Sequence, residues 1–200
     1  MDILILISLI STFLFSLSAA ISAIRKRFDL IGIFFISFLS GTGGGILRDI
    51  LLGKYPITCV QDPKFALATI LASFTTILFK IKKMKQFKAF IMFDSLGLGS
   101  ATVLGVQKAL NSDINPYMAI LFGVISACFG SVVRDLLCNE TPLLFKEELY
   151  ATVSIIGSIF YIIMIFLGLD IILASLLSVG IIFILRMVSV KYKLVLPKIR

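Results

Sequence analysis

The 200-residue sequence has no tryptophan and no histidine, and only 15% of its residues are charged. Soluble domains carry about 25% charged residues, so the chain lacks the side chains that a water-exposed surface needs. The absence of histidine removes the usual acid–base catalyst near neutral pH and a common metal ligand. Because the sequence also offers no nucleophile–base pair and no cluster of metal ligands, we expect neither an enzyme nor a resident metal or cofactor.

Cysteine is scarce as well, and the three cysteines stand at unrelated spacings, at Cys59, Cys128 and Cys138. They form neither a CxxC pair nor an even set that would indicate a disulfide framework. The sequence therefore indicates small apolar thiols rather than a redox or metal site.

Hydrophobic residues make up 59% of the chain, and the mean hydropathy is +1.09. A membrane-crossing helix needs about 20 apolar residues. Seven segments of roughly this length are separated by short polar connections: 3–24, 30–53, 65–81, 88–109, 116–138, 148–168 and 170–189. The pattern predicts an all-α, polytopic membrane protein with seven transmembrane helices, residues 1–200 forming one domain whose solvent is the lipid bilayer.

The net charge of +8 could indicate nucleic-acid binding, but the basic residues stand in the connections between apolar runs. Retention at an anionic cytoplasmic leaflet explains them better, and we expect no nucleic-acid partner. The first segment opens with Met1-Asp2 and its basic cluster follows the apolar run, which is unlike a cleavable signal peptide.

Orientation follows from the distribution of lysine and arginine, which favour cytoplasmic loops. One set of alternate connections holds Arg25, Lys26, Arg27, Lys80, Lys82, Lys83, Lys85, Lys88, Lys146, Lys191, Lys193, Lys198 and Arg200, and the other holds Lys54, Lys64 and Lys108. This bias predicts a protein of the cell (inner) membrane with its N-terminus outside and its C-terminus in the cytoplasm.

An internal repeat is visible when the chain is shifted by 86 residues. Arg48-Asp49 then falls on Arg134-Asp135, Gly44 on Gly130 and Pro56 on Pro142. We expect repeat one at about 3–82, repeat two at about 88–168 and a seventh helix at about 170–190. Because each unit has three crossings, the second must be inserted upside down, and such inverted repeats place an ion or substrate path at their interface.

The repeat contains a run of small residues near the middle of the second and fifth segments: Gly41, Thr42, Gly43, Gly44 and Gly45, matched by Gly130 and Ser131. By helical rise the glycines lie roughly 17–22 Å from the cytoplasmic start of their segment. They could form a close-packing face, or a kink or unwound turn whose carbonyls face a water-filled path. Their number and the mirrored small residues favour the kink. A phosphate-binding loop is excluded because neither the spacing nor a lysine fits.

The paired charges Arg48-Asp49 and Arg134-Asp135 lie close to opposite membrane faces by the same count. Adjacent helical residues do not face each other, so we expect incomplete neutralisation within each pair. The candidate partners are Lys108 and Asp62 outside, and Asp94 and Lys146 inside. A structural salt bridge and a pore lining remain open for both pairs. Asp94 would attract cations, and Lys108 would counter it.

Three stretches of the sequence resemble a known family. GTGGGILRDILLGKYP, FGSVVRDLLCNETPLLFKEELYAT and the stretch VLGVQKA at 103–109 are similar to bacterial TRIC-type (trimeric intracellular cation) channels, also catalogued as a glycine-transporter-like domain that occurs twice per chain. The resemblance implies seven helices, an inverted repeat, a homotrimer and one potassium-permeable path per protomer, lined by kinked second and fifth helices.

By position, the family's glycine motif falls on Gly43, Gly44, Gly45 and Gly130 with Ser131. Phe129 and Ser131 stand where a glycine is usual, which implies a milder second kink, and Ala19 replaces a glycine in the first helix. We therefore expect a passive cation channel, with hydroxyls such as Thr42, Ser131 and Ser95 along the path, whose only ligands are the permeant potassium ion and bound lipid. The alternative is a carrier for a small zwitterion such as glycine.

Overall fold

The computed structural model describes residues 3–79, 83–146 and 149–195, with the side chains of 83–86 left aside. Within these ranges the chain is helical and contains no strand, which confirms that the fold is all-α. The elements are α1 Ile3–Arg25, α2 Leu30–Leu51, α3 Thr58–Gln61, α4 Lys64–Leu78, α5 Lys83–Leu110, α6 Pro116–Leu137, the 3₁₀ turn η1 Leu143–Phe145, α7 Ala151–Phe166 and α8 Ile171–Tyr192.

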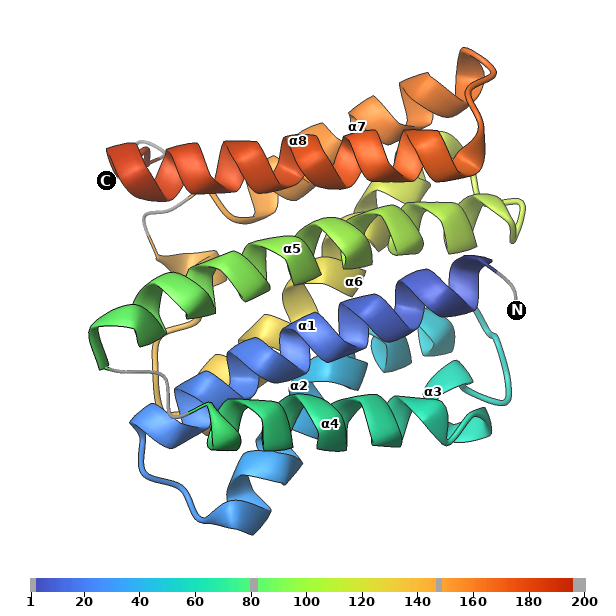
Figure 1. The fold of residues 1–200 in the computed structure, drawn as a ribbon. Coiled ribbons are helices and arrows are strands. Elements are labelled where there is room, and N and C mark those ends of the chain that lie inside the picture. The colour runs from blue at the N-terminus through green and yellow to red at the C-terminus, as the bar shows by residue number, and fades with distance from the viewer. Residues whose placement is uncertain (1–2, 80–82, 147–148, 196–200) are drawn as a thin grey trace.

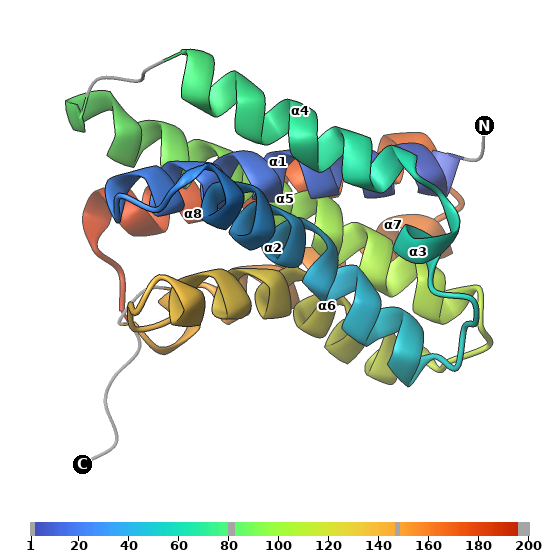
Figure 2. The same cartoon turned by 90° about the horizontal axis from the view of Figure 1, so that it is seen from below.

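The helices form one bundle around a central group of four, α1, α2, α5 and α6, which pack against one another (Figure 1). Helix α4 covers α1 and α2 on one side, while α7 and α8 cover α5 and α6 on the other (Figures 1 and 2). Helix α5 runs opposite to α1, and α6 runs opposite to α2. The connections at 52–57 and 111–115 therefore gather at the same end of the bundle as the start of α1.

Five of the helices, α1, α2, α5, α6 and α8, are long and apolar enough to cross a membrane. The predicted spans 65–81 and 148–168 correspond to α4 and α7, which have 15 and 16 residues and are shorter than expected. Helix α4 ends at Leu78 and α7 begins at Ala151, inside the apolar segments 65–81 and 148–168, and the short elements α3 and η1 precede them outside these segments. Lys80, Lys82, Lys198 and Arg200 of the predicted cytoplasmic set lie outside the described residues.

Polarity is distributed in the reverse of a soluble protein. Many serines and threonines are buried in the bundle, whereas large apolar side chains such as Ile31, Phe74 and Leu176 are exposed on its surface. A surface of this kind is stable against hydrocarbon rather than water, because burial in lipid costs apolar groups nothing. The distribution agrees with the bilayer as the solvent.

The ends of α2 and α6 are built alike, 86 residues apart. At the start of α2 the Asp29 carboxylate accepts a hydrogen bond from the Gly32 N–H at 2.7 Å, and at the start of α6 the Asn115 side-chain oxygen accepts one from the Met118 N–H at 2.9 Å. Such caps satisfy donors that a helix start leaves free.

The C-terminal ends correspond in the same way. The Lys54 N–H donates to the Asp49 carbonyl at 2.9 Å, and the Glu140 N–H donates to the Asp135 carbonyl at 2.8 Å. The residue before each donor, Gly53 or Asn139, has a positive φ of 65° or 51°, as this helix ending requires. The two helices therefore begin and end at equivalent sequence positions while running in opposite directions.

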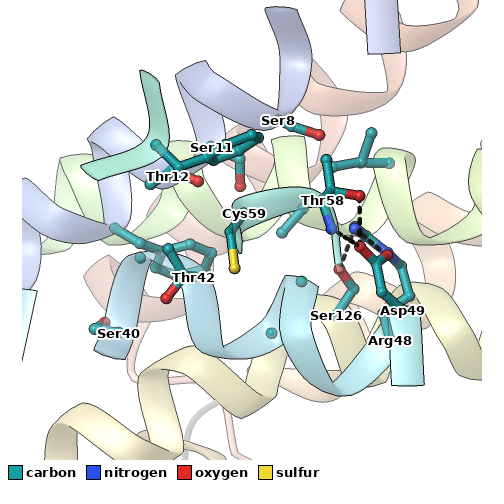
Figure 3. A pocket seen from close by; sticks show the side chains of 17 residues that line it. Ser8, Ser11, Thr12, Ser40, Thr42, Arg48, Asp49, Thr58, Cys59 and Ser126 are labelled. Atoms are coloured by element: carbon teal, nitrogen blue, oxygen red, sulfur yellow. Dashed lines mark hydrogen bonds and ion pairs between the residues drawn. The ribbon is translucent and has the colours of Figure 1, made fainter. Parts of the chain in front are cut away.

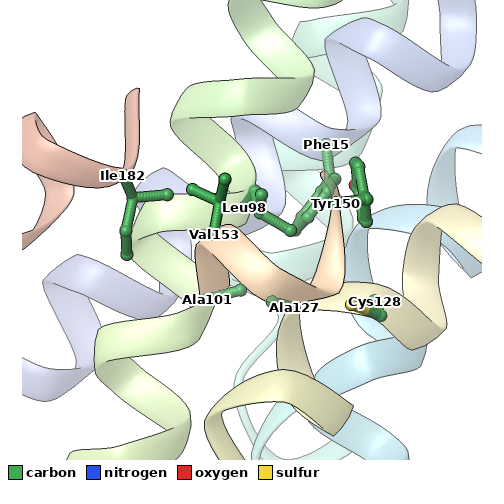
Figure 4. Close-up of a cluster of buried hydrophobic side chains, with 8 residues drawn as sticks. All are labelled: Phe15, Leu98, Ala101, Ala127, Cys128, Tyr150, Val153 and Ile182. Atoms are coloured by element: carbon green, nitrogen blue, oxygen red, sulfur yellow. The ribbon is translucent and has the colours of Figure 1, made fainter. Parts of the chain in front are cut away.

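A cluster of buried apolar side chains fills the bundle between the central helices and α7 and α8 (Figure 4). Its members are Phe15, Leu98, Ala101, Ala127, Cys128, Tyr150, Val153 and Ile182. Two of its members, Phe15 and Ala101, also line the cavity described below.

Candidate functional site

Helices α2 and α6 cross with almost no space between their backbones. A Cβ on Gly44 would overlap the carbonyl oxygen of Ser126, and a Cβ on Gly130 would overlap that of Ser40. These two contacts are equivalent under the offset of 86 residues, so each glycine packs against the equivalent carbonyl group of the other helix. The glycines therefore allow a close crossing of two helices.

Of the two forms of the expected break, a kink or an unwound turn, the unwound turn is absent. Both helices are unbroken through residues 41–45 and 127–131. Thr42 Oγ1 donates to the carbonyl of Phe38 at 2.7 Å, within its own helix. The alternative, a close-packing face, explains the glycine run, because the crossing supplies the contacts that offset glycine's low helix propensity.

Two charged clusters are named outer and inner after the predicted orientation. The outer charged cluster lies where α2 ends. Arg48 folds back on its neighbour and donates from Nε and Nη2 to Asp49 Oδ1, at 2.9 and 2.7 Å. The Thr58 hydroxyl donates to Asp49 Oδ2 at 2.6 Å. Lys108 Nζ lies 3.3 Å from Asp49 Oδ1 and donates to Thr58 Oγ1 at 2.8 Å, and Arg48 Nη1 lies 3.3 Å from the Ser126 hydroxyl. One carboxylate thus has two cationic partners.

An inner charged cluster lies where α6 ends. Arg134 Nε donates to Asp135 Oδ1 at 2.8 Å, and its Nη1 donates to Asp94 Oδ1 and, at 3.1 Å, to the Ser18 hydroxyl. The other oxygen of Asp135 accepts the Leu143 N–H at 2.9 Å. Arg134 is fully buried, so here one cation holds two carboxylates together.

These contacts correct part of the electrostatic prediction. The adjacent Arg-Asp residues do pair, because the arginine side chain is long enough to fold around the helix onto the next residue. Lys108 and Asp94 are confirmed as further partners. Asp62 and Lys146 are not the partners expected: Asp62 pairs with Lys64 at 3.4 Å, and Lys146 lies 4.0 Å from Glu140.

A polar cavity opens beside the outer cluster, between α1, α2 and the turn that contains α3 (Figure 3). It is narrow, because only about 30 Å³ of it can hold the centre of a water-sized molecule, and it is partly open to the surroundings. Its wall carries seven hydroxyl side chains, Ser8, Ser11, Thr12, Ser40, Thr42, Thr58 and Ser126, together with Arg48, Asp49 and Cys59. It is the hydroxyl oxygens, rather than freed carbonyls, that this wall offers to a guest.

The predicted site residues divide between the cavity and the packed core. Gly41, Thr42, Gly44, Gly45, Arg48 and Asp49 line the cavity. Gly43 faces Gly130 across the crossing, and Ser131, Ser95, Asp94, Arg134 and Asp135 are buried away from its wall. Lys108 reaches the outer cluster from α5 without being part of the lining.

Sequence reasoning missed the contribution of α1. Ser8, Ser11 and Thr12 recur at the spacing of one helix face, with Phe15 one turn further on, so they present a polar stripe that ends in an aromatic ring. The spacing of these residues was the feature of the sequence from which the polar stripe could have been predicted. Thr58 could not have been found in this way, because it approaches Asp49 only through the turn that follows α2.

The described part of the chain contains no group of three or more Cys, Asp or Glu side chains able to hold a metal ion. The carboxylates of both clusters are occupied by arginine, lysine and hydrogen-bond donors.

An apolar exterior, long apolar helices and buried ion pairs define a multi-pass helical membrane protein. The chain belongs to the glycine transporter family, whose model matches residues 5–80 and again 91–165. A UPF0126 membrane protein of Vibrio cholerae is 30% identical over 198 residues, 98% of this chain and 82% of that protein. The UPF0126 inner membrane protein YadS of Escherichia coli is 27% identical over 96% of this chain and 93% of its own.

Solved structures are similar over the whole chain and confirm the resemblance to prokaryotic TRIC channels. The TRIC trimeric intracellular cation channel orthologue from Rhodobacter sphaeroides is 29% identical, with a TM-score of 0.89, covering 97% of this chain and 100% of that one. A prokaryotic TRIC channel studied in 0.5 M KCl is 28% identical, with a TM-score of 0.87, over 96% and 97%. These relatives are channels, which agrees with the prediction that the chain is not an enzyme.

Proposed function

We propose that the chain is a potassium-permeable cation channel with one pathway in each protomer, running between α1, α2, α5 and α6. The observation that carries the proposal is the hydroxyl-lined cavity at the α2–α6 crossing, in a chain 28–33% identical to proteins described as TRIC cation channels. Hydroxyl oxygens can replace part of the hydration shell of a monovalent cation without holding it tightly. A path of this kind conducts because binding stays weak.

The proposal includes an inverted repeat and seven crossings. The matching caps of α2 and α6, their opposite directions and the twofold match of the family model support the repeat of 3–82 on 88–168. With α4 and α7 completing each repeat and α8 as the seventh crossing, the N-terminus lies outside and the C-terminus in the cytoplasm. The kinked form of α2 and α6 is replaced in this proposal by a tight crossing of unbroken helices.

Orientation has a direct test. In protein whose Cys59 is replaced by serine, a cysteine placed at Ser112, in the connection between α5 and α6, should react with a membrane-impermeant thiol reagent added outside spheroplasts, whereas one placed at Lys26 should not. Both positions are outside the long helices and in short turns. The reverse pattern would contradict the proposed orientation and leave the fold unchanged.

A homotrimer is part of the proposal because the similar solved channels are described as trimeric. The exposed apolar side chains of α4, α7 and α8 offer surface both for lipid and for further copies of the chain. Mass measurement of the purified protein in nanodiscs tests it: three chains per particle are expected, and a monomer would contradict the assembly.

A glycine carrier is the second candidate, and the description of the family model is the observation that favours it. Against it, a zwitterion needs a free cation for its carboxylate and a free anion for its ammonium group. At the cavity Arg48 and Asp49 are bonded to each other at 2.7 Å, so neither is available without breaking a buried pair. The uncharged hydroxyl oxygens of the wall therefore suit a monovalent cation better than a zwitterion, while the excess positive charge of the outer cluster opposes its entry.

The test separates the two functions in one preparation. Proteoliposomes loaded with potassium should release it when an added protonophore lets protons enter in exchange, at a rate that rises linearly with the potassium gradient. Saturable uptake of labelled glycine, without potassium release, would overturn the channel and support the carrier. Gly180→Ala adds a methyl group in open space on α8 and is the control variant. It should release potassium at the same rate as the wild type.

Lys108 offers a prediction about conductance. Its ammonium gives the outer cluster two cations for one carboxylate, so the cluster repels an entering cation. Lys108→Met keeps the length of the side chain and the Arg48–Asp49 pair, and we expect a larger single-channel potassium current than in the wild type. Lys64→Met, on an exposed side chain paired with Asp62, is the control and should leave the current unchanged.

A further inference from the structure

The polar cavity stops at a phenylalanine ring. Phe15 and Ala101 are the two residues that belong both to the cavity wall and to the buried apolar cluster. Under the offset of 86 residues Ala101 is also the counterpart of Phe15, so the same position carries a large side chain in one repeat and a small one in the other. The second repeat has only a methyl group at the position where the first repeat has the Phe15 ring.

Packing holds this ring in place. Phe15 is only 2% exposed, and a Cβ added to Gly97 of α5 would lie 3.1 Å from its Cγ. Figure 4 shows the ring beside that of Tyr150. With α5 against one face and Tyr150 nearby, no room remains for a hydrated ion between α1 and α5.

Beyond the ring, apolar residues replace some of the hydroxyl residues that line the cavity. Ser8 and Thr12, on the cavity wall, have Asp94 and Leu98 as their counterparts in repeat two, and Thr42 has Cys128. Leu98 and Cys128 lie in the apolar cluster, and Asp94 is tied to Arg134. An ion that left the cavity would have to cross this apolar layer before it reached the inner charged cluster.

We propose that the Phe15 ring is the closed gate of the pathway, an apolar barrier between the outer hydroxyl-lined cavity and the inner Arg134–Asp94–Asp135 cluster. An apolar constriction blocks ions because it stays dry, and conduction requires the ring to leave the gap between α1 and α5. The proposal rests on the channel function proposed above, but its main test measures access to the core and needs no conduction.

The three native cysteines report that access. Cys59 lines the cavity, Cys128 lies in the apolar cluster, and Cys138 is buried at the far end of α6. Burial, and after it the Asp49 carboxylate, raise the pKa of the Cys59 thiol, so labelling is run in mildly alkaline buffer to supply thiolate. The probe is a small cationic methanethiosulfonate, applied to the protein in nanodiscs and read out by peptide mass.

In the wild type Cys59 should be labelled, and Cys128 and Cys138 should not. In Phe15→Ala the rate at Cys128 should rise about tenfold or more, because labelling no longer waits for a local opening, while Cys138 stays protected and shows that the fold is intact. Phe15→Ser gives a second way to remove the ring should the alanine variant not fold. Phe15→Leu keeps an apolar plug and should behave as the wild type.

Ile182→Ala is the matched control, since it removes apolar volume from the same cluster but from α8, away from the cavity. Cys128 should remain protected in it. Equal labelling of Cys128 in Ile182→Ala and Phe15→Ala, or protection in all the Phe15 variants, would overturn the gate. Labelling of Cys128 in Phe15→Ala without any rise in potassium flux would support the barrier and contradict the channel function.

Discussion

Replacing Arg134 with alanine is expected to remove most of the folded protein from the membrane. The change removes the arginine to which the buried Asp94 and Asp135 carboxylates are bonded, and breaking a buried pair in this way costs about 3–5 kcal/mol. Native proteins are stable by only about 5–15 kcal/mol, so the loss is a large share of the total. The measurement is the amount of monodisperse protein and its melting temperature in detergent.

The equivalent change in the other repeat provides the comparison. Arg48→Ala should destabilise less than Arg134→Ala, because Asp49 keeps Lys108 at 3.3 Å and the Thr58 hydroxyl at 2.6 Å. Adding Asp94→Asn to Arg134→Ala removes one unpaired charge and should recover part of the loss, as a double-mutant cycle would record. Equal effects of the two arginine changes would contradict the unequal composition of the two clusters.

Substitution at the α2–α6 crossing is expected to have the second large effect. In Gly44→Leu the new side chain meets the Ser126 backbone, and in Gly130→Leu it meets that of Ser40. Backbone atoms cannot rotate away, so the helices must separate, at a cost above the usual 1–3 kcal/mol of core overpacking. Both variants should lose folded protein rather than fold normally and merely stop conducting.

Gly180→Ala is the control for helix propensity. A Cβ there meets nothing within 4 Å, so the change should be neutral or stabilise α8 by up to about 1 kcal/mol. Thermal unfolding of the three variants side by side separates steric overlap from propensity. A normally folded Gly44→Leu protein would show that α2 and α6 can move apart without cost.

Much of the fold could be predicted from the sequence, because the bilayer imposes a simple rule. Apolar runs of about 20 residues had to be helices, and the offset of 86 residues paired α2 with α6 before any contact was known. The partners Lys108 and Asp94 could also be predicted, since few charges were available at each end of the bundle. The bounds of the shorter α4 and α7 could not, because an apolar run does not mark the residue at which its helix begins or ends.

The glycine run shows why the site was harder to predict. A glycine in a helix has two physical uses, a break or a close approach, and the choice depends on what packs against it. Only the structure brings Ser126 against Gly44 and Ser40 against Gly130. The pairing of Arg48 with its own neighbour was missed for a related reason, since the rule about adjacent positions concerns Cβ directions and ignores a long side chain that folds back.

The most direct test of the account is the reversal potential of single-channel currents from purified protein in a planar bilayer with a potassium gradient. Discrete current steps that reverse near the potassium equilibrium potential, with larger steps in Lys108→Met and more frequent openings in Phe15→Ala, are the predicted result. A bilayer that contains folded, trimeric protein and shows no steps, in the wild type or in Phe15→Ala, would contradict the proposed channel.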